Sequence, residues 1–152
     1  MKRILLTGRT GQVGRELQRA LAPLGTIVCV DRSQMNLTSP DSIRRVIREV
    51  SPSIIVNAAG YTAVDKAESE SALAMQVNGM APGVMAEEAR RLGALLVHYS
   101  TDYVYDGTKG TPYVEDDAPN PLNEYGRTKL EGERAIAAAG CRHLILRISW
   151  IY

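Results

Sequence analysis

Tyr125 and Lys129 are the residues whose types and spacing most directly suggest chemistry. They stand four positions apart in a segment with helical patterning, so the phenol and the ammonium lie on one helix face, about one turn from each other. Because a nearby cation favours phenolate, we expect the pKa of Tyr125 to fall below its ordinary value of about 10. Such a tyrosine can exchange a proton with an alkoxide or alcohol near neutral pH. The spacing alone is weak evidence, since an exposed tyrosine beside a solvated lysine also produces it.

Thr101 is a second candidate, because it follows the apolar run 94–99 together with Ser100 and Asp102. Open α/β sheets bind their ligands where parallel strands end. The Thr101 hydroxyl at that position can bond a substrate oxygen that the Tyr125 phenol also reaches. The alternative is a helix or turn cap, which the same residue type fills well.

Gly8, Gly11 and Gly14 form a G-x-x-G-x-x-G turn between the apolar run 4–6 and a helical pattern that ends before Pro23. Glycines allow a tight turn and a close backbone approach, and the helix N-terminus offers free N–H groups to a phosphate. A plain strand-to-helix turn remains the alternative, because the spacing is not G-x-G-x-x-G. The strand before the turn and the helix after it favour nucleotide binding.

Asp31 stands at the end of the next predicted strand, 26–30, about 20 residues after the glycine turn. An acidic residue at this point can meet the adenosine ribose hydroxyls of a dinucleotide. It can equally be a loop carboxylate that caps a turn. Arg9 or Arg32 can meet a 2′-phosphate, so the sequence leaves NADH and NADPH both open.

Other elements continue the alternation of strands and helices. Ser39, before Pro40, is the N-cap candidate of a helix over 38–50, and Gly140 is the C′ glycine of the helix that contains Tyr125 and Lys129. Small residues follow the apolar strand 53–56, where a ring and a ribose can lie against the backbone. The helical region 71–92 should kink or restart at Pro82, and for Asn78 before that break a surface position is favoured. Within the predicted strand 94–99, His98 is expected to be a core histidine. The alternation predicts an α/β protein: a Rossmann-like, doubly wound parallel sheet with helices on both faces.

Composition narrows the class of protein. The 152 residues are about one domain long, and a net charge of +1 without a basic tract argues against nucleic acid as a partner. Cys29 and Cys141 are too few for a disulfide framework and lack metal-ligand spacing, which favours a cytoplasmic protein without a metal site. No stretch is long and apolar enough to span a membrane, and the short apolar start indicates a strand rather than a signal peptide.

Several runs of residues together resemble the extended short-chain dehydrogenase/reductase superfamily and, within it, the dTDP-4-dehydrorhamnose reductases. These runs are 8–14, 56–59, 61–68, 100–105, 121–129 and 147–152. They extend over nearly the whole chain. The run Thr-Ala-Val-Asp-Lys-Ala-Glu and the terminal Ser-Trp-Ile-Tyr are much more specific than the general superfamily signals.

This resemblance implies a reaction and the residues that perform it. NADPH or NADH would reduce the C4 ketone of dTDP-4-dehydrorhamnose to give dTDP-L-rhamnose. Tyr125 would donate the proton, Lys129 would lower its pKa and bond the nicotinamide ribose, and Thr101 would hold the ketone oxygen. The candidate cofactor-binding residues are Gly8, Gly11, Gln12, Val13, Gly14, Asp31, Arg32, Asn36, Leu37, Ala59, Gly60, Tyr61, Thr62, Tyr125 and Lys129. The candidate substrate-binding residues are Val64, Asp65, Thr101, Asp102 and Trp150.

Three departures from the family pattern qualify this expectation. Asn36-Leu37 falls where an Asp-hydrophobe pair is usual near adenine, and Tyr61 stands where histidine is frequent. Family members are about twice as long as this chain, which is typical of two domains. We therefore expect residues 1–152 to be the NAD(P)-binding domain of a longer enzyme whose C-terminal substrate domain is missing here, with a homodimer possible for the full-length enzyme.

Two other classes fit part of the pattern. A non-catalytic NAD(P)-binding regulatory subunit, similar to that of methionine adenosyltransferase, can share the fold without needing Thr101, Tyr125 and Lys129 together. A nucleotide-sugar epimerase or dehydratase can share Tyr125 and Lys129. Dehydratases usually carry acidic residues after the threonine, whereas here only Asp102 follows and Tyr103 comes next. The residues present favour simple reduction.

Overall fold

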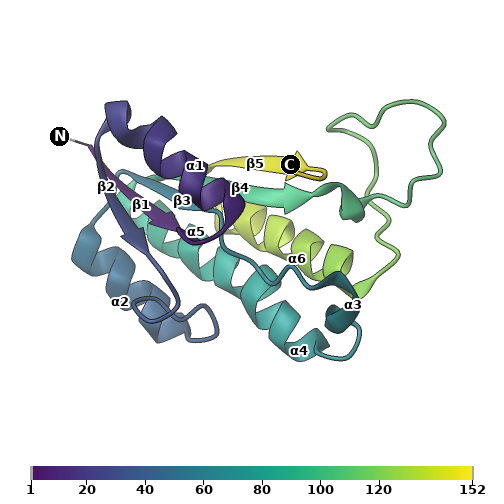
Figure 1. The fold of residues 1–152 in the computed structure, drawn as a ribbon, viewed down its shortest axis with the longest axis horizontal. Helices are drawn as coiled ribbons and strands as arrows, with labels where there is room; N and C mark the ends of the chain where they lie inside the picture. Colours follow the sequence, from purple (N-terminus) through teal and green to yellow (C-terminus); the bar gives the residue numbers. More distant parts are fainter. Residues whose placement is uncertain (1, 152) are drawn as a thin grey trace.

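The computed structural model describes residues 2–151 and shows one parallel sheet with helices on both faces (Figure 1). Its five strands lie in the order β2-β1-β3-β4-β5. The strands are β1 (Arg3–Thr7), β2 (Thr26–Val30), β3 (Ile54–Asn57), β4 (Leu95–Thr101) and β5 (Arg142–Ile148). The helices are α1 (Gln12–Leu21), α2 (Pro40–Val50), α3 (Val64–Ala67), α4 (Ser71–Ala74), α5 (Ala81–Leu92) and α6 (Glu124–Ala139). The predicted Rossmann-like, doubly wound fold is confirmed.

The central strand β1 is buried on both faces, as its continuous apolar run predicts. Ile4, Leu5 and Leu6 have no exposed surface. Leu5 packs into the larger core with residues of neighbouring strands and of α2, α5 and α6, while Ile4 and Leu6 pack with residues of α1 on the opposite face. Strands covered on both faces need apolar residues at every position, which is why the run does not alternate.

The two halves of the sheet wind in opposite directions from β1. The chain passes from β1 to β2 on one side and then returns to β3 on the other side of β1. A crevice opens beyond the carboxyl ends of the strands at such a switch point, and ligands of doubly wound sheets bind there. The glycine turn after β1 and the small residues after β3 flank this crevice. The topology alone therefore brings two of the predicted ligand-binding segments together.

The helical region 71–92 contains a π-helical segment, Met75–Met80, between α4 and α5. Pro82 has no N–H to donate to the carbonyl of Asn78, so the regular hydrogen-bond ladder cannot continue there. Gly132 of α6 packs directly on that carbonyl, since a Cβ at Gly132 would overlap the Asn78 oxygen. The break expected at Pro82 is confirmed, and it allows α6 to approach closely.

Caps at their ends fix where the long helices α2 and α6 begin and where α6 stops. Ser39 accepts a hydrogen bond from the Ser42 N–H at the start of α2, and Asn123 accepts one from the Gly126 N–H at the start of α6. Gly140 ends α6 in the left-handed region with φ 68°. The caps predicted at Ser39 and Gly140 are confirmed, and α6 is therefore held in register with Tyr125 in its first turn.

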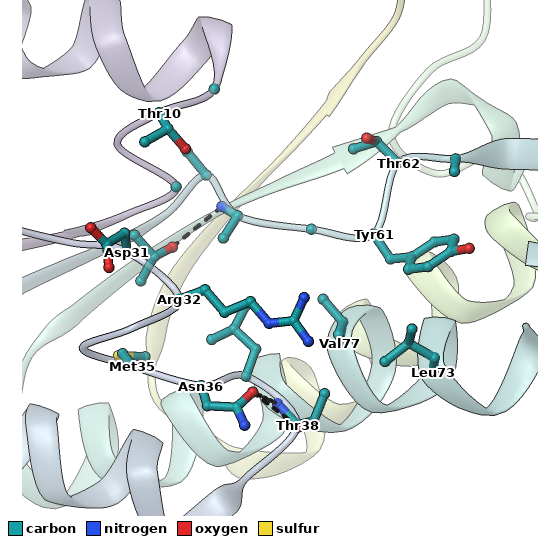
Figure 2. A pocket seen from close by; sticks show the side chains of 18 of the residues that line it. Thr10, Asp31, Arg32, Met35, Asn36, Thr38, Tyr61, Thr62, Leu73 and Val77 are labelled. Atoms are coloured by element: carbon teal, nitrogen blue, oxygen red, sulfur yellow. Dashed lines mark hydrogen bonds between the residues drawn. The ribbon is translucent and has the colours of Figure 1, made fainter.

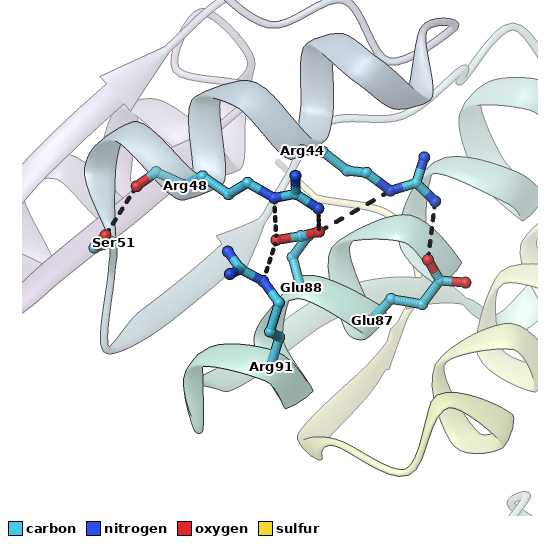
Figure 3. A network of polar contacts seen from close by, with 6 residues as sticks. All are labelled: Arg44, Arg48, Ser51, Glu87, Glu88 and Arg91. Atoms are coloured by element: carbon cyan, nitrogen blue, oxygen red, sulfur yellow. Dashed lines mark hydrogen bonds and ion pairs between the residues drawn. The ribbon is translucent and has the colours of Figure 1, made fainter.

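A buried carboxylate fastens α2 to α5 on the face away from α1 (Figure 3). Glu88 has a side chain only 4% exposed, and its oxygens lie 2.6 Å from Arg48 Nη2 and 3.0 Å from Arg91 Nε. Hydrogen bonding to Arg48 lowers the pKa of Glu88 despite burial. Arg44 bridges Glu88 and the neighbouring Glu87. This cluster braces the scaffold and lies outside the ligand crevice.

Two negative findings apply to residues 2–151. No helix in this range combines the length and apolar character that crossing a membrane requires. In the same range, no three His, Cys, Asp or Glu side chains gather as metal ligands, and Cys29 and Cys141 are both free thiols.

Candidate functional site

Two cavities meet along the carboxyl edge of the sheet, with Gly11, Ala58–Gly60 and Thr62 lining both. The first has a volume of about 600 Å³ and the second about 460 Å³. Asp31, Arg32, Asn36, Leu37 and Tyr61 line the first cavity. Gln12, Val13, Val64, Thr101, Asp102, Tyr125, Lys129 and Trp150 line the second. The structure thus brings most of the predicted site residues into one continuous groove.

The N-terminus of α1 is open toward this groove. Its N-cap is Gly11, no side chain caps it, and its first turn contains no acidic residue. The first N–H groups of a helix have no intrahelical partner and carry the positive end of the helix dipole. Ser39 and Asn123 satisfy such groups at α2 and α6, whereas at α1 they remain available to an anion.

Close packing explains the glycines of the turn. Gly8 has φ 75°, and a Cβ there would lie 2.7 Å from the carbonyl carbon of Ala58. A Cβ at Gly14 would overlap the carbonyl oxygen of Gly8. The Gly11 N–H donates to Gly8 O at 3.0 Å and closes the turn. The glycines leave backbone accessible to the groove beside the open helix N-terminus, so the residues present fit a dinucleotide pyrophosphate.

Asp31 and Arg32 border the first cavity (Figure 2). Asp31 Oδ1 accepts from the N–H and the hydroxyl of Ser33, while Asp31 Oδ2 lies 2.7 Å from Arg9 Nη2. The Ser33 hydrogen bonds are the main reason that the pKa of Asp31 is lowered. Asp31 is therefore both a turn-capping carboxylate and a residue of the cavity. Arg32 has no ion-pair partner among residues 2–151, and its guanidinium extends toward Val77 in Figure 2.

The positions that depart from the family pattern are both held by local hydrogen bonds. Asn36 Oδ1 accepts from the N–H and the hydroxyl of Thr38, so the amide oxygen serves its own loop. Tyr61 donates its hydroxyl to Glu70 Oε2 at 2.5 Å, and this bond raises the pKa of Tyr61 to about 12. Tyr61 is thus a neutral donor fixed on the wall of the first cavity.

Tyr125 and Lys129 line the second cavity together with Thr101, so the predicted shared helix face is confirmed. Lys129 is 5% exposed, and its Nζ donates to the carbonyl oxygen of Tyr99 at 2.5 Å. Burial lowers the pKa of Lys129 to about 8, and the nearby charge of Glu133 opposes that change. The ammonium is therefore held by the backbone of β4.

The expectation that Lys129 lowers the pKa of Tyr125 is wrong in this structure. Burial raises the pKa of Tyr125, and the charge of Asp102 raises it further, whereas contact with the Thr101 hydroxyl lowers it. Desolvation of the phenolate outweighs the sequence argument, which considered only the charge four residues away. Tyr125 is therefore a protonated phenol near neutral pH.

Thr101 is a turn cap, as one of its predicted alternatives states, and it also lies at the second cavity. Its Oγ1 accepts from the Tyr103 N–H at 3.1 Å and so caps the short 3₁₀ helix Asp102–Val104. The same residue is 4% exposed and lines the second cavity beside Tyr125. The cap fixes the hydroxyl in place, since one of its lone pairs is already used.

Asn78 was expected at the surface, and that expectation is wrong, since it is 1% exposed. Its Oδ1 accepts from the Tyr61 N–H at 2.8 Å, and its Nδ2 donates to Tyr61 O at 3.0 Å and to Thr128 Oγ1 at 3.2 Å. Asn78 therefore ties the strand-end loop to α6. Pro82, four residues later, was the available signal, because a broken helix turn often holds a functional polar group.

The other predicted residues differ in where they lie. Ala59, Gly60 and Thr62 lie where the cavities meet. Trp150 is 75% exposed at the mouth of the second cavity, while Asp65 lies in α3 outside the lining of either cavity. Tyr152, the last residue of the terminal motif, lies outside the described residues. His98 is buried as expected, with Nδ1 3.0 Å from the Asn57 amide.

Comparisons with known proteins agree with this geometry. The family model described as RmlD substrate binding domain matches residues 1–152. A dTDP-4-dehydrorhamnose reductase of Burkholderia thailandensis is 50% identical over 150 residues, which are 99% of this chain and 50% of the relative. The enzyme of the same name from Escherichia coli K12 is 48% identical, over 98% of this chain and 51% of the relative.

Solved structures give the same result. The dTDP-4-dehydrorhamnose reductase of Bacillus anthracis in complex with NADP superposes with a TM-score of 0.95 at 36% identity, covering 99% of this chain and 54% of that one. A UDP-glucose 4-epimerase of Thermus thermophilus, at 21% identity and a TM-score of 0.85, shares the fold alone. The chain spans about half the length of the curated relatives it matches. By sequence and by structure, this chain belongs to the RmlD substrate binding domain family.

Proposed function

We propose that this chain is the dinucleotide-binding part of an NAD(P)H-dependent dTDP-4-dehydrorhamnose reductase. The enzyme reduces the C4 ketone of dTDP-4-dehydro-6-deoxy-L-mannose and gives dTDP-L-rhamnose. The observation that carries the proposal is that Thr101, Tyr125 and Lys129 line one cavity, directly beside the uncapped N-terminus of α1. The names of the relatives support the substrate, and the NADP complex of one relative supports the cofactor.

The chain's own residues would hold the dinucleotide along the groove. The N–H groups of Gln12 and Val13 would bind the pyrophosphate, Asp31 would meet the adenosine ribose, and Lys129 would bond the nicotinamide ribose. Bound NAD(P)H supplies the hydride to C4 of the sugar. Arg32, which lines the first cavity and has no ion pair among residues 2–151, would meet a 2′-phosphate, so the proposal includes both NADPH and NADH.

Proton transfer is the task of Tyr125. As the ketone carbon accepts hydride, its oxygen gains negative charge, takes the phenolic proton of Tyr125 and becomes the C4 hydroxyl. Burial keeps that phenol protonated beforehand, which suits a general acid. The Thr101 hydroxyl holds the same oxygen, and its contact with Tyr125 favours the phenolate that remains.

The sugar would lie over the second cavity. Val64, Asp102 and Trp150 line its outer part and are the proposed sugar contacts. Asp65 lies in α3, outside both cavities. Its proposed contact with the sugar would therefore need the second half of the protein. The two unpaired cysteines fit a reducing cytoplasm. Gel filtration of the full-length enzyme tests the proposed homodimer.

Two experiments test the proposal. Calorimetric titration of this chain with NADPH and with NADH measures dinucleotide binding directly, and no binding at millimolar cofactor would show that the groove needs residues beyond this chain. Turnover is measured in a chimera that continues from residue 152 into the second half of the Burkholderia thailandensis relative. Oxidation of NADPH that depends on the dTDP-4-keto sugar supports reduction. Sugar conversion without net NADPH consumption would instead support an epimerase.

A further inference from the structure

Glu133 is a buried carboxylate that touches none of the groups proposed to meet substrate or cofactor. It lies on α6 one turn beyond Lys129 and is 7% exposed. Ser100 Oγ donates to its Oε1 at 2.5 Å. Arg147 of β5 donates to it from Nε at 3.0 Å and from Nη2 at 2.6 Å. A buried charge bonded by two other elements of the fold is costly unless its geometry is well satisfied, as it is here.

Ser100 connects the Glu133 carboxylate to the proposed site through a hydrogen bond. It is the middle residue of the run 99–101 at the end of β4. The carbonyl of Tyr99, at one end of the run, accepts from Lys129 Nζ, and the hydroxyl of Thr101, at the other end, lines the second cavity. Glu133 therefore anchors the centre of a three-residue segment whose two ends serve the proposed reaction.

The same carboxylate is linked to the 105–121 segment, which extends away from the body of the molecule in Figure 1. Arg147 Nη1 donates to the Tyr105 hydroxyl at 2.5 Å, and the Tyr105 ring stacks on Tyr113 with centroids 4.1 Å apart. Four parts of the chain, α6, β4, β5 and this segment, thus converge on one ion pair.

We propose that Glu133 is a positioning residue, which holds the run 99–101 against Lys129 through Ser100 and supports the ammonium with its charge. This inference rests on the proposed reduction. The charge of Glu133 does favour the protonated form of Lys129, against burial. The other titratable groups around the pair are His98 on β4, whose pKa burial lowers well below its usual range, Arg147 on β5 and Tyr105.

The state of Lys129 can be followed without turnover. The chain contains four lysines, Lys2, Lys66, Lys109 and Lys129, so ¹³Cε-labelled lysine gives few signals, and Lys129→Met assigns the relevant one. Glu133→Gln should move the titration midpoint of Lys129 down by about 1 pH unit, because an opposite charge is lost nearby. Glu133→Asp keeps the charge and should restore most of that change.

Matched variants separate positioning from general damage. Glu131→Gln, on the exposed side of the same helix where it pairs with Arg134, should leave the midpoint unchanged. Since Glu133→Gln leaves Arg147 without its partner, the double variant Glu133→Gln/Arg147→Met removes both charges and is used if the single variant does not fold. In the chimera, Ser100→Ala should lower kcat by roughly tenfold with the KM for NADPH unchanged, the pattern of a contact that matters in the transition state.

An unchanged Lys129 midpoint in folded Glu133→Gln or in the double variant would overturn the inference, as would an unchanged kcat in Ser100→Ala. Because the titration involves no ketone, its result is distinguishable from a failure of the proposed function. A shifted midpoint in a chimera that never consumes NADPH with the keto sugar would refute reduction while leaving the coupling of Glu133 to Lys129 in place.

Discussion

The two cavities of the groove differ in how far their charged side chains are exposed to solvent. Asp31, which lines the first, forms an ion pair at 2.7 Å with Arg9 just outside that lining, and the two side chains are 25% and 43% exposed. In the second, the Lys129 ammonium is buried and bonded to a backbone carbonyl. Exposed pairs are screened by water and contribute little free energy, whereas buried charges shift pKa values and stability strongly.

This difference separates the part of the groove that can discriminate between cofactors from the part that holds the candidate catalytic residues. The first cavity presents exposed side chains that can adjust to a ribose with or without a 2′-phosphate. The second holds Lys129 and Thr101 through backbone partners before any ligand arrives, which is how a preorganised site stabilises developing charge. The predictions below test this contrast, from the largest expected effect to the smallest.

Removing the phenol should have the largest effect. In the chimera, Tyr125→Phe should lower kcat roughly 10³-fold, because no group remains to protonate the developing alkoxide. Tyr113→Phe, which removes a phenol outside both cavities, is the control and should retain activity. Ketone-dependent NADPH oxidation measures both. Full activity in Tyr125→Phe would remove the basis of the proposed mechanism.

Burial of Lys129 should appear in the pH dependence of stability. Its pKa is about 8 in the folded chain and 10.5 ordinarily, so between these values the unfolded chain binds more protons. The free energy of unfolding should therefore rise with pH across this window, by up to about 3 kcal/mol from this group. Urea unfolding of the chain and of Lys129→Met measures the difference, and parallel pH profiles for the two would contradict a buried lysine.

Adding a side chain to the glycine turn should disturb the segment around Gly11, which lines both cavities. A Cβ at Gly14 would overlap the Gly8 carbonyl, so Gly14→Ala must displace the turn. We expect a loss of about 2 kcal/mol in unfolding free energy, the usual scale for overpacking, and weaker binding of both dinucleotides. Gly110→Ala is the control, because nothing lies within 4 Å of its added Cβ. Equal stability of the two variants would show that the turn is less tightly packed.

The smallest effect is expected in the first cavity. Arg32→Ala should weaken NADPH binding by about 1 kcal/mol, the scale of an exposed charge contact, and leave NADH binding unchanged. Arg134→Ala, on the exposed face of α6, is the control. Calorimetry at low and at high salt gives a second criterion, since the Arg32 effect should shrink as salt screens it. An equal loss for both dinucleotides would assign Arg32 another role.

Local patterns predicted much of the fold because they depend on neighbours in the chain. The strand 26–30, the cap at Ser39 and the end of α6 at Gly140 all appear where the sequence places them. Each follows from short-range physics: apolar runs, a side-chain oxygen before a helix, or a glycine that tolerates the left-handed region. The glycine turn belongs to the same class.

The two predictions that the structure contradicts, a surface position for Asn78 and a lowered pKa for Tyr125, fail for one reason. Segments far away in the sequence bury both side chains. Asn78 is buried because α6 approaches the broken helix turn through Gly132, about fifty residues later. The pKa of Tyr125 rises because tertiary packing removes water, an effect that spacing along a helix does not report. Ser100 belongs to the run 100–105 but had no predicted role, Glu133 belongs to no motif, and only the fold brings them within 2.5 Å.

The sequence by itself determined that Tyr125 and Lys129 share a helix face, that a glycine turn precedes α1, and that Thr101 ends a strand. Only the tertiary structure decided how these groups behave: the phenol is kept protonated, and the ammonium is bonded to Tyr99 and placed one turn from Glu133. Spacing fixes which way a side chain points, because backbone geometry is local. Desolvation and charge pairing depend on every segment that packs against it, and these set its chemistry.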